Sequence, residues 1–188
     1  VFDLPKACLN VEVYCPWCTE SLRNRAITSA WCHAVSEELN ELSYDADVAG
    51  LYYSLSASSR GLGLRFAGYQ DKLPVLLRTI AEKMVALTEV SEHTWNLVQT
   101  VMVRNAKNAA KNRQPYQQAS EWEQRCLLRS AATTGELLEE IQKLQREQLT
   151  GVSKQLLDNC YSEALLQGNF AADEVGGVLE ALLPAVRP

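Results

Sequence analysis

The sequence has very little histidine: His33 and His93 are its only two, and they lie far apart in the chain. The zinc-peptidase signature H-x-x-E-H, which needs two histidines and a glutamate on one helix face, is therefore absent. A Gly-x-Ser-x-Gly nucleophile elbow is missing too, and no Gly-rich loop ends in the Lys-Ser/Thr of a phosphate-binding loop. These absences predict that the chain holds no catalytic residues of its own.

Positive charge and long apolar runs are also scarce. The chain has 18 Lys and Arg against 23 Asp and Glu, a net charge of −5, so we expect no nucleic-acid partner. No apolar run approaches the roughly 18–20 residues that cross a membrane, so we expect no membrane partner. The first residue is not Met and no signal segment follows it, which suggests a piece of a longer protein.

The six cysteines do not form the compact framework of a secreted domain, and we predict reduced thiols. Reduced thiols indicate an intracellular setting, either the cytoplasm or an organellar matrix. The sequence does not separate the two.

Two alternating runs and a following helix form the segment around which we expect the chain to pack. Period-two alternation over 51–58 and 62–69, on both sides of a Gly-containing turn, predicts a β-hairpin. From Lys72 to Met84 the apolar residues recur at helical spacing, with Pro74 in the first turn. The side chains expected to face the helices are Leu51, Tyr53, Leu55, Leu62, Leu64 and Phe66.

The remaining patterns predict one α+β domain over residues 1–188, with helices on one face of a mainly antiparallel sheet of four or more strands. We expect strands at 7–14 and 161–167, and helices at 20–42, 91–113, from 115, at 133–144, from 150 and at 173–183. Ser91 is the expected N-cap of the long helix, and Thr133 with Glu136 has the spacing of a capping box. We expect the aromatic residues at helical or strand spacing to lie mostly in the core.

The sequence Cys15-Pro-Trp-Cys18 is the motif most suggestive of chemistry. It follows a predicted strand and precedes a predicted helix, the position in which thioredoxin-like enzymes carry a redox CxxC. Such enzymes need parallel βαβ connections, whereas helix follows helix downstream of this motif. We therefore expect structural thiols without a lowered thiol pKa, and keep thiol redox chemistry at Cys15 and Cys18 as an alternative.

Two further candidate sites rest on less specific patterns. Cys15, Cys18, Cys32 and His33 supply zinc-ligand types, but Cys32 and His33 are adjacent on a helix and their side chains diverge. We therefore predict no metal site. The basic residues Arg104, Lys107, Lys111 and Arg113 fall on one side of a predicted helix, which is typical of a solvated face; the alternative is an anion-binding patch.

Several segments, in order along the chain, resemble the third domain of the zinc metallopeptidases of family M16, the pitrilysin-type group that includes the insulin-degrading enzymes and the nardilysins. The matching segments are Leu4–Asn10, Tyr44–Leu51, Gly61–Leu62, Gly68–Tyr69, Asp71–Pro74 and Glu163–Asn169. These residues leave open whether the parent is of the insulin-degrading or the nardilysin type.

The resemblance implies a middle domain that opens the C-terminal half of a larger enzyme. In that family, the N-terminal half carries zinc and catalysis, and the C-terminal half helps to enclose and bind the peptide substrate. The implied partners are the other domains of the same peptidase and its peptide substrates, and no cofactor is expected in this chain. The peptide-binding residues remain unidentified. A non-catalytic scaffold subunit derived from the peptidase fold is a further alternative, and we expect an isolated domain to self-associate through surface that its neighbours would cover.

Overall fold

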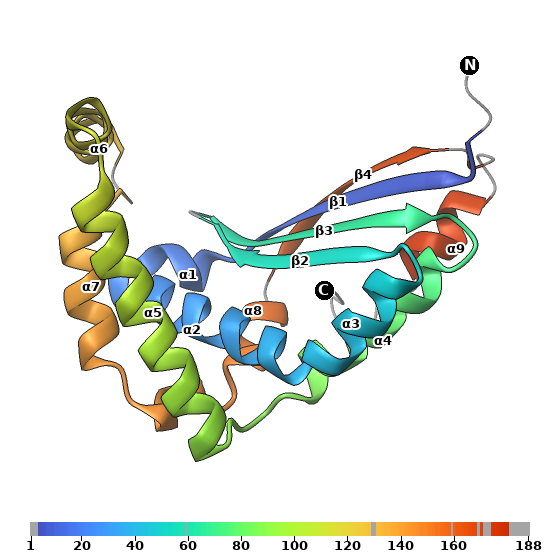
Figure 1. Ribbon diagram of the computed structural model, residues 1–188, viewed down its shortest axis with the longest axis horizontal. Helices are drawn as coiled ribbons and strands as arrows, with labels where there is room; N and C mark the ends of the chain where they lie inside the picture. Colours follow the sequence, from blue (N-terminus) through green and yellow to red (C-terminus); the bar gives the residue numbers. More distant parts are fainter. Residues whose placement is uncertain are drawn as a thin grey trace.

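The computed structural model describes residues 4–58, 60–128, 131–158, 160–168, 170 and 174–180. Within these residues, a twisted sheet lies above a layer of helices (Figure 1). The elements, in chain order, are β1 (Lys6–Tyr14), α1 (Pro16–Glu20), α2 (Leu22–Glu38), α3 (Asn40–Val48), β2 (Tyr52–Ala57), β3 (Gly61–Tyr69), α4 (Leu73–Ala86), α5 (Glu92–Asn112), α6 (Pro115–Leu127), α7 (Thr134–Lys143), the 3₁₀ turn η1 (Arg146–Leu149), α8 (Val152–Leu157), β4 (Tyr161–Gly168) and α9 (Glu174–Glu180). None of the described helices is both long and apolar enough for a membrane span.

The sheet has four strands in the order β2-β3-β1-β4, and every neighbouring pair is antiparallel. Leu9 of β1 lies opposite Phe66 of β3 on one side and Leu166 of β4 on the other, and Tyr53 of β2 continues the row. Leu9 and Phe66 are fully buried. The predicted hairpin, its register and the α+β fold class are therefore confirmed.

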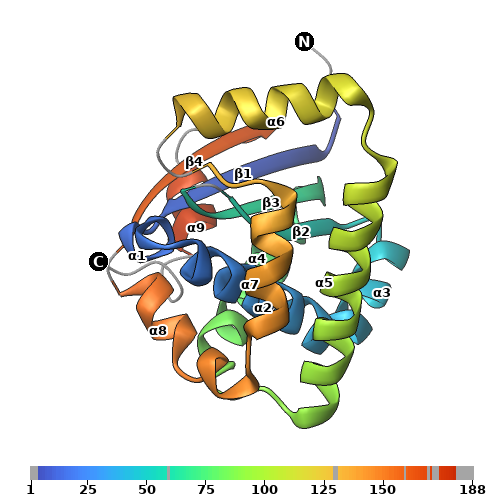
Figure 2. The same cartoon turned by 90° about the vertical axis from the view of Figure 1, so that its left-hand side faces the viewer.

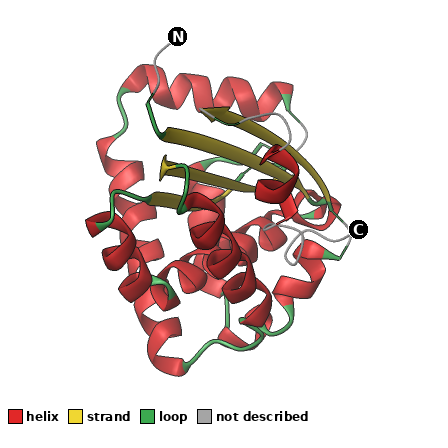
Figure 3. Cartoon of the chain, turned by 90° about the vertical axis from the view of Figure 1, so that its right-hand side faces the viewer, coloured by secondary structure: helices red, strands yellow, loops and turns green. Residues whose placement is uncertain are grey.

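The helix layer covers one face of this sheet, and Figure 3 shows the same layering from the right-hand side of Figure 1. Helix α2 runs through the middle of the layer and buries Trp31 completely, together with small neighbours such as Ala30 and Ala34. Helix α4 buries Leu73, Leu77 and others along a stripe at helical spacing. The apolar residues of strand and helix therefore meet in one layer of core between the sheet and the helices.

Close backbone approach at Gly61 ties the hairpin tip to the end of β1. A Cβ atom placed on Gly61 would lie 2.0 Å from the carbonyl oxygen of Val13, a distance that no side chain tolerates. The same contact brings the Cys15 N–H to the Arg60 carbonyl oxygen at 2.9 Å. Glycine is required here so that the hairpin can hold the chain at the start of the Cys15–Cys18 turn.

Several helix boundaries differ from the prediction. The single helix expected at 20–42 is divided into α2 and α3, and α3 continues to Val48. Pro16 begins the separate short helix α1, and the Ser21 hydroxyl caps α2 by accepting from the Asn24 N–H at 3.0 Å. Helix α8 begins after Gly151, which has a positive φ of 72°, rather than at Thr150. The N-cap at Ser91 and the capping box of Thr133 are confirmed. The last predicted helix is described only as α9, and 181–183 lie outside the described residues.

Helix α6 contradicts the expectation that aromatic residues at helical spacing are core. It leaves the end of α5, and Figure 2 shows it crossing in front of the upper end of the sheet. None of its residues is buried; Trp122 is 62% exposed and Tyr116 is 71% exposed. Its apolar stripe has the period of a packed helix, but no described element lies against it closely enough to bury it.

Candidate functional site

The two histidines do not form a catalytic or metal-binding pair. His33 lies on α2 and His93 on α5, and both are exposed. Among the described residues, no three or more His, Cys, Asp or Glu side chains are grouped so that they could hold a metal ion. These residues do not fit the zinc site of an M16 peptidase, and they offer no general base beside such a metal.

The four residues considered as zinc ligands are not grouped as a metal site among the described residues. Cys15, Cys18 and Cys32 are buried, whereas His33 points out of the same helix that buries Cys32. Burial raises the pKa of the Cys32 thiol well above its usual range. The complete burial of Cys32 agrees with a packing role.

Cys15 and Cys18 form a close thiol pair at the turn between β1 and α1. The Cys18 N–H donates to the Cys15 carbonyl oxygen at 3.1 Å, and each side chain is only 1% exposed. The sulfur of Cys18 also lies 3.3 Å from the Thr28 hydroxyl of α2, and the Cys15 thiol donates to the Gln155 carbonyl oxygen of α8 at 3.6 Å. The pair is therefore held by the neighbouring helix α2 and by α8, which lies far along the chain.

The electrostatics of this pair contradict our expectation of ordinary structural thiols. A hydrogen bond from the Cys18 thiol lowers the pKa of Cys15 well below its usual value, opposed by burial and assisted by the Cys18 and Trp17 N–H groups. The same hydrogen bond, together with burial, raises the pKa of Cys18. Cys15 is therefore favoured as the thiolate and Cys18 as the thiol. The CxxC spacing alone did not establish this difference.

A third thiol and a pocket adjoin the pair. Cys160 and Cys15 both line a pocket of about 490 Å³, together with Arg60 and two tyrosines. The rings of Tyr14 and Tyr161 are stacked with centroids 5.8 Å apart, and the Arg60 guanidinium lies 5.1 Å from the centre of the Tyr14 ring. Burial raises the pKa of the Cys160 thiol, and the nearby Cys15 charge raises it further. Sequence reasoning missed Cys160, because only the pairing of β1 with β4 reveals its position.

The sheet face opposite the helices is a second candidate surface. Strand β4 lies at the edge of the sheet and most of its residues are exposed; Leu165 is 56% exposed and Tyr161 is 63% exposed. Along this face the Tyr14 hydroxyl donates to the Glu163 carboxylate at 2.9 Å. No described element pairs with the outer edge of β4, so its backbone donors and acceptors are available to another chain. Leu4, the first described residue, is also exposed.

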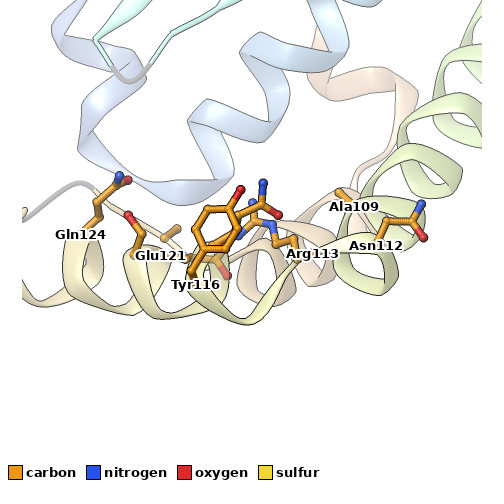
Figure 4. A pocket seen from close by; sticks show the side chains of 9 residues that line it. Ala109, Asn112, Arg113, Tyr116, Glu121 and Gln124 are labelled. Atoms are coloured by element: carbon orange, nitrogen blue, oxygen red, sulfur yellow. The ribbon is translucent and has the colours of Figure 1, made fainter.

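The basic side of α5 divides into two parts. Arg104, Lys107 and Lys111 are exposed along a shallow groove of about 480 Å³, as a solvated helix face would be. Arg113 instead forms a salt bridge with Glu121 of α6, and Figure 4 shows the two at the hollow between α5 and α6. The four basic residues therefore do not act as one patch.

That hollow has a volume of about 570 Å³, and its lining mixes polar side chains with Ala109, Tyr116 and Ala132. Glu121 accepts from the Thr134 hydroxyl at 2.7 Å as well as from the Thr134 N–H and Arg113. Burial raises the pKa of Glu121, but the hydrogen bonds from Thr134 and the Arg113 charge lower it more, so the net shift is downward. One oxygen of this carboxylate already has three partners within the protein, and the hollow is therefore better explained as the joint of α6 than as a ligand site.

Comparison with known proteins extends these observations. A family model described as the middle or third domain of peptidase M16 matches residues 1–140. The insulin-degrading enzyme of Homo sapiens is 32% identical over 95% of this chain and 17% of its own length. The peroxisomal insulin-degrading enzyme-like 1 of Arabidopsis thaliana is 29% identical over 96% of this chain and 18% of its own length.

The fold agrees with the sequence matches. The crystal structure of pitrilysin has a TM-score of 0.82 at 18% sequence identity, covering 98% of this chain and 20% of that one. The chain thus spans less than a fifth of the length of the curated relatives it matches. Since the matching model covers most of the residues, the chain belongs to peptidase family M16, in which it represents the middle or third domain.

Proposed function

We propose that this chain is a non-catalytic domain of a larger zinc metalloendopeptidase and forms part of the wall that encloses the peptide substrate. Family membership as a middle domain supports this proposal. The sequence lacks the two closely spaced histidines of H-x-x-E-H, which agrees with zinc and catalysis residing elsewhere in the polypeptide. The core shared by sheet and helices supports treating residues 1–188 as one domain.

The uncovered face of the sheet carries the proposal of a substrate contact. On this face, Leu165 and Tyr161 present apolar surface next to the unpaired edge of β4. An extended peptide can use such an edge because its backbone N–H and C=O groups pair with the strand, while adjacent side chains select what binds.

The test compares the isolated chain with the full-length polypeptide. We expect the isolated chain to cleave no peptide and to hold no stoichiometric zinc by elemental analysis, and the full-length polypeptide to show chelator-sensitive peptidase activity. Peptidase activity in the isolated chain would refute the non-catalytic assignment. A full-length polypeptide without activity would instead support the scaffold-subunit alternative.

The contact surface is tested in the full-length polypeptide by Leu165→Lys. We expect kcat/KM for a long peptide to fall by about tenfold, because a lost apolar contact of about 1–2 kcal/mol has that effect on rate. Val75→Lys is the matched control: Val75 is a 63% exposed apolar residue on α4, on the helix side of the sheet. Equal effects of the two substitutions, or none from Leu165→Lys, would refute a substrate contact at β4.

A further inference from the structure

Three thiols converge where β1 ends, and this arrangement has no part in the proposed chamber-wall function. In the antiparallel pairing of β1 with β4, Tyr14 lies opposite Tyr161, so the next residues outward along the two chains are Cys15 and Cys160. Both line the same pocket. Cys18 follows one turn later, with its N–H bonded to the Cys15 carbonyl oxygen. Two cysteine side chains therefore line one opening in the surface, and the third lies one turn behind Cys15.

The geometry favours a bond between Cys15 and Cys18 over a bond to Cys160. The turn closed by the 3.1 Å hydrogen bond keeps the Cα atoms of residues 15 and 18 within about 7 Å, near the range of about 4.4–6.8 Å that a disulfide spans. The Cys160 thiol instead donates to the Leu157 carbonyl oxygen at 3.3 Å. Cys18 is also the group that shifts the pKa of Cys15 most.

The pocket supplies the access that a buried pair would otherwise lack. Cys15 is almost completely buried, but it forms part of the wall of an opening of about 490 Å³, together with Pro16 and Thr19. Cys18 lies behind it, against Thr28. A small reagent in the pocket therefore meets Cys15 first and reaches Cys18 only through Cys15.

We propose that Cys15 and Cys18 form a reversible thiol–disulfide exchange site for small-molecule disulfides, with Cys15 as the attacking sulfur and Cys18 as the resolving sulfur. The Cys15 thiolate attacks one sulfur of the disulfide, forming a mixed disulfide and releasing the first small thiolate. Cys18 then loses its proton and attacks the Cys15 sulfur as a thiolate, and the second small thiolate leaves and takes up a proton. The two protein thiols lose two electrons, and the small disulfide is reduced to two thiols.

The charges around the pair agree with these two roles. The titratable groups near Cys15 are Cys18 and Glu20 of α1, Cys160 before β4, and Tyr14 and Arg60 at the pocket wall. Cys18 lowers the pKa of Cys15 and Glu20 raises it. The attacking sulfur is thus the one favoured as thiolate, and the resolving sulfur keeps the proton that the leaving group needs.

The test equilibrates the 188-residue chain in mixtures of reduced and oxidised glutathione, quenches it with acid and maps the cysteines by mass spectrometry. Trypsin cuts after Lys6 and Arg23, so one peptide carries Cys8, Cys15 and Cys18, and fragmentation of that peptide locates the bond. We expect a Cys15–Cys18 disulfide that dithiothreitol reverses. Since mapping needs only the wild-type chain, the result does not depend on how any variant folds.

Variants then assign the two roles. Cys18→Ser should trap one glutathione on Cys15, whereas Cys15→Ser should leave Cys18 unmodified, an asymmetry that a structural role for the pair would not produce. Cys126→Ser, at an exposed cysteine of α6, is the matched control and should keep the disulfide. Circular dichroism of each variant confirms that it is folded.

Alkylation of the reduced chain supplies an independent readout. The pH midpoint for Cys15 should lie below the roughly 8.5 of a free thiol and should rise in Cys18→Ser. A disulfide between Cys15 and Cys160 would overturn the proposed pair. Modification of Cys8 or Cys126 alone, with Cys15 and Cys18 still reduced at the most oxidising ratio, would overturn the site.

Discussion

Replacing Phe66 by alanine removes the largest side chain at the centre of the sheet's buried face. Phe66 is fully buried and lies between Leu9 of β1 and Tyr53 of β2. Returning a Phe side chain to water accounts for about 1.5–3 kcal/mol, and the cavity left among fixed strands adds to this. We expect the free energy of unfolding to fall by about 3–5 kcal/mol, the range observed for a buried Phe→Ala change.

The assay is equilibrium urea unfolding followed by circular dichroism, with Arg65→Ala as the matched control. Arg65 is the preceding residue of β3 and points to the exposed face, so its loss should change the free energy of unfolding by about 0.5 kcal/mol or less. A loss below about 1 kcal/mol for Phe66→Ala, or an equal loss in both variants, would refute the register, because a shift of one residue exchanges the two faces.

Three further predictions concern the hairpin tip, the joint of α6 and the exposed surfaces. Gly61→Ala should lower the free energy of unfolding by more than about 1 kcal/mol in urea titrations, since its Cβ would meet the Val13 carbonyl. The folded-state pKa of Glu121 is lowered, so its contribution is complete above the unfolded value of about 4.3 and is lost as pH falls through the folded value. Glu121→Gln should therefore lower the free energy of unfolding at pH 7 and weaken its fall below about pH 4.3. An unchanged pH dependence below about pH 4.3 in urea titrations would contradict this. The isolated chain should self-associate through the edge of β4 and the exposed stripe of α6, and sedimentation showing a strict monomer at high concentration would argue against covered surfaces there.

The sequence was sufficient to predict the elements whose pattern depends on one buried face. Leu62, Leu64 and Phe66 alternate because β3 is covered on one side only, and this alternation identified both the hairpin and its register. The N-caps could also be predicted, because the Ser91 and Thr133 side chains accept hydrogen bonds from backbone N–H groups within their own first turns. Such interactions are local, so the chain order alone contains them.

Features that depend on distant contacts could not be predicted in this way. Trp122 has the spacing of a packed residue, but whether a helix stripe is buried depends on which element lies against it. The environment of the Cys15–Cys18 pair likewise depends on Gln155, Thr28 and Cys160, and the CxxC motif identifies none of them. The motif suggested redox chemistry, the downstream helices argued against a thioredoxin fold, and the altered thiol pKa emerged only from the tertiary arrangement.

The joint between α5 and α6 has a consequence for how the chain opens. Helix α6 buries no side chain, and its described links to the rest of the chain are polar: Arg113 to Glu121, Glu121 to Thr134, and Arg125 to Glu136 at 3.3 Å. Salt screens such links, whereas it leaves apolar packing largely intact. The amide hydrogens of α6 should therefore exchange with solvent through a local opening, and faster than those of α2. The exchange rate of α6 should rise with ionic strength. Helix α6 would then be an arm of the domain whose mobility increases with the ionic strength of the solution.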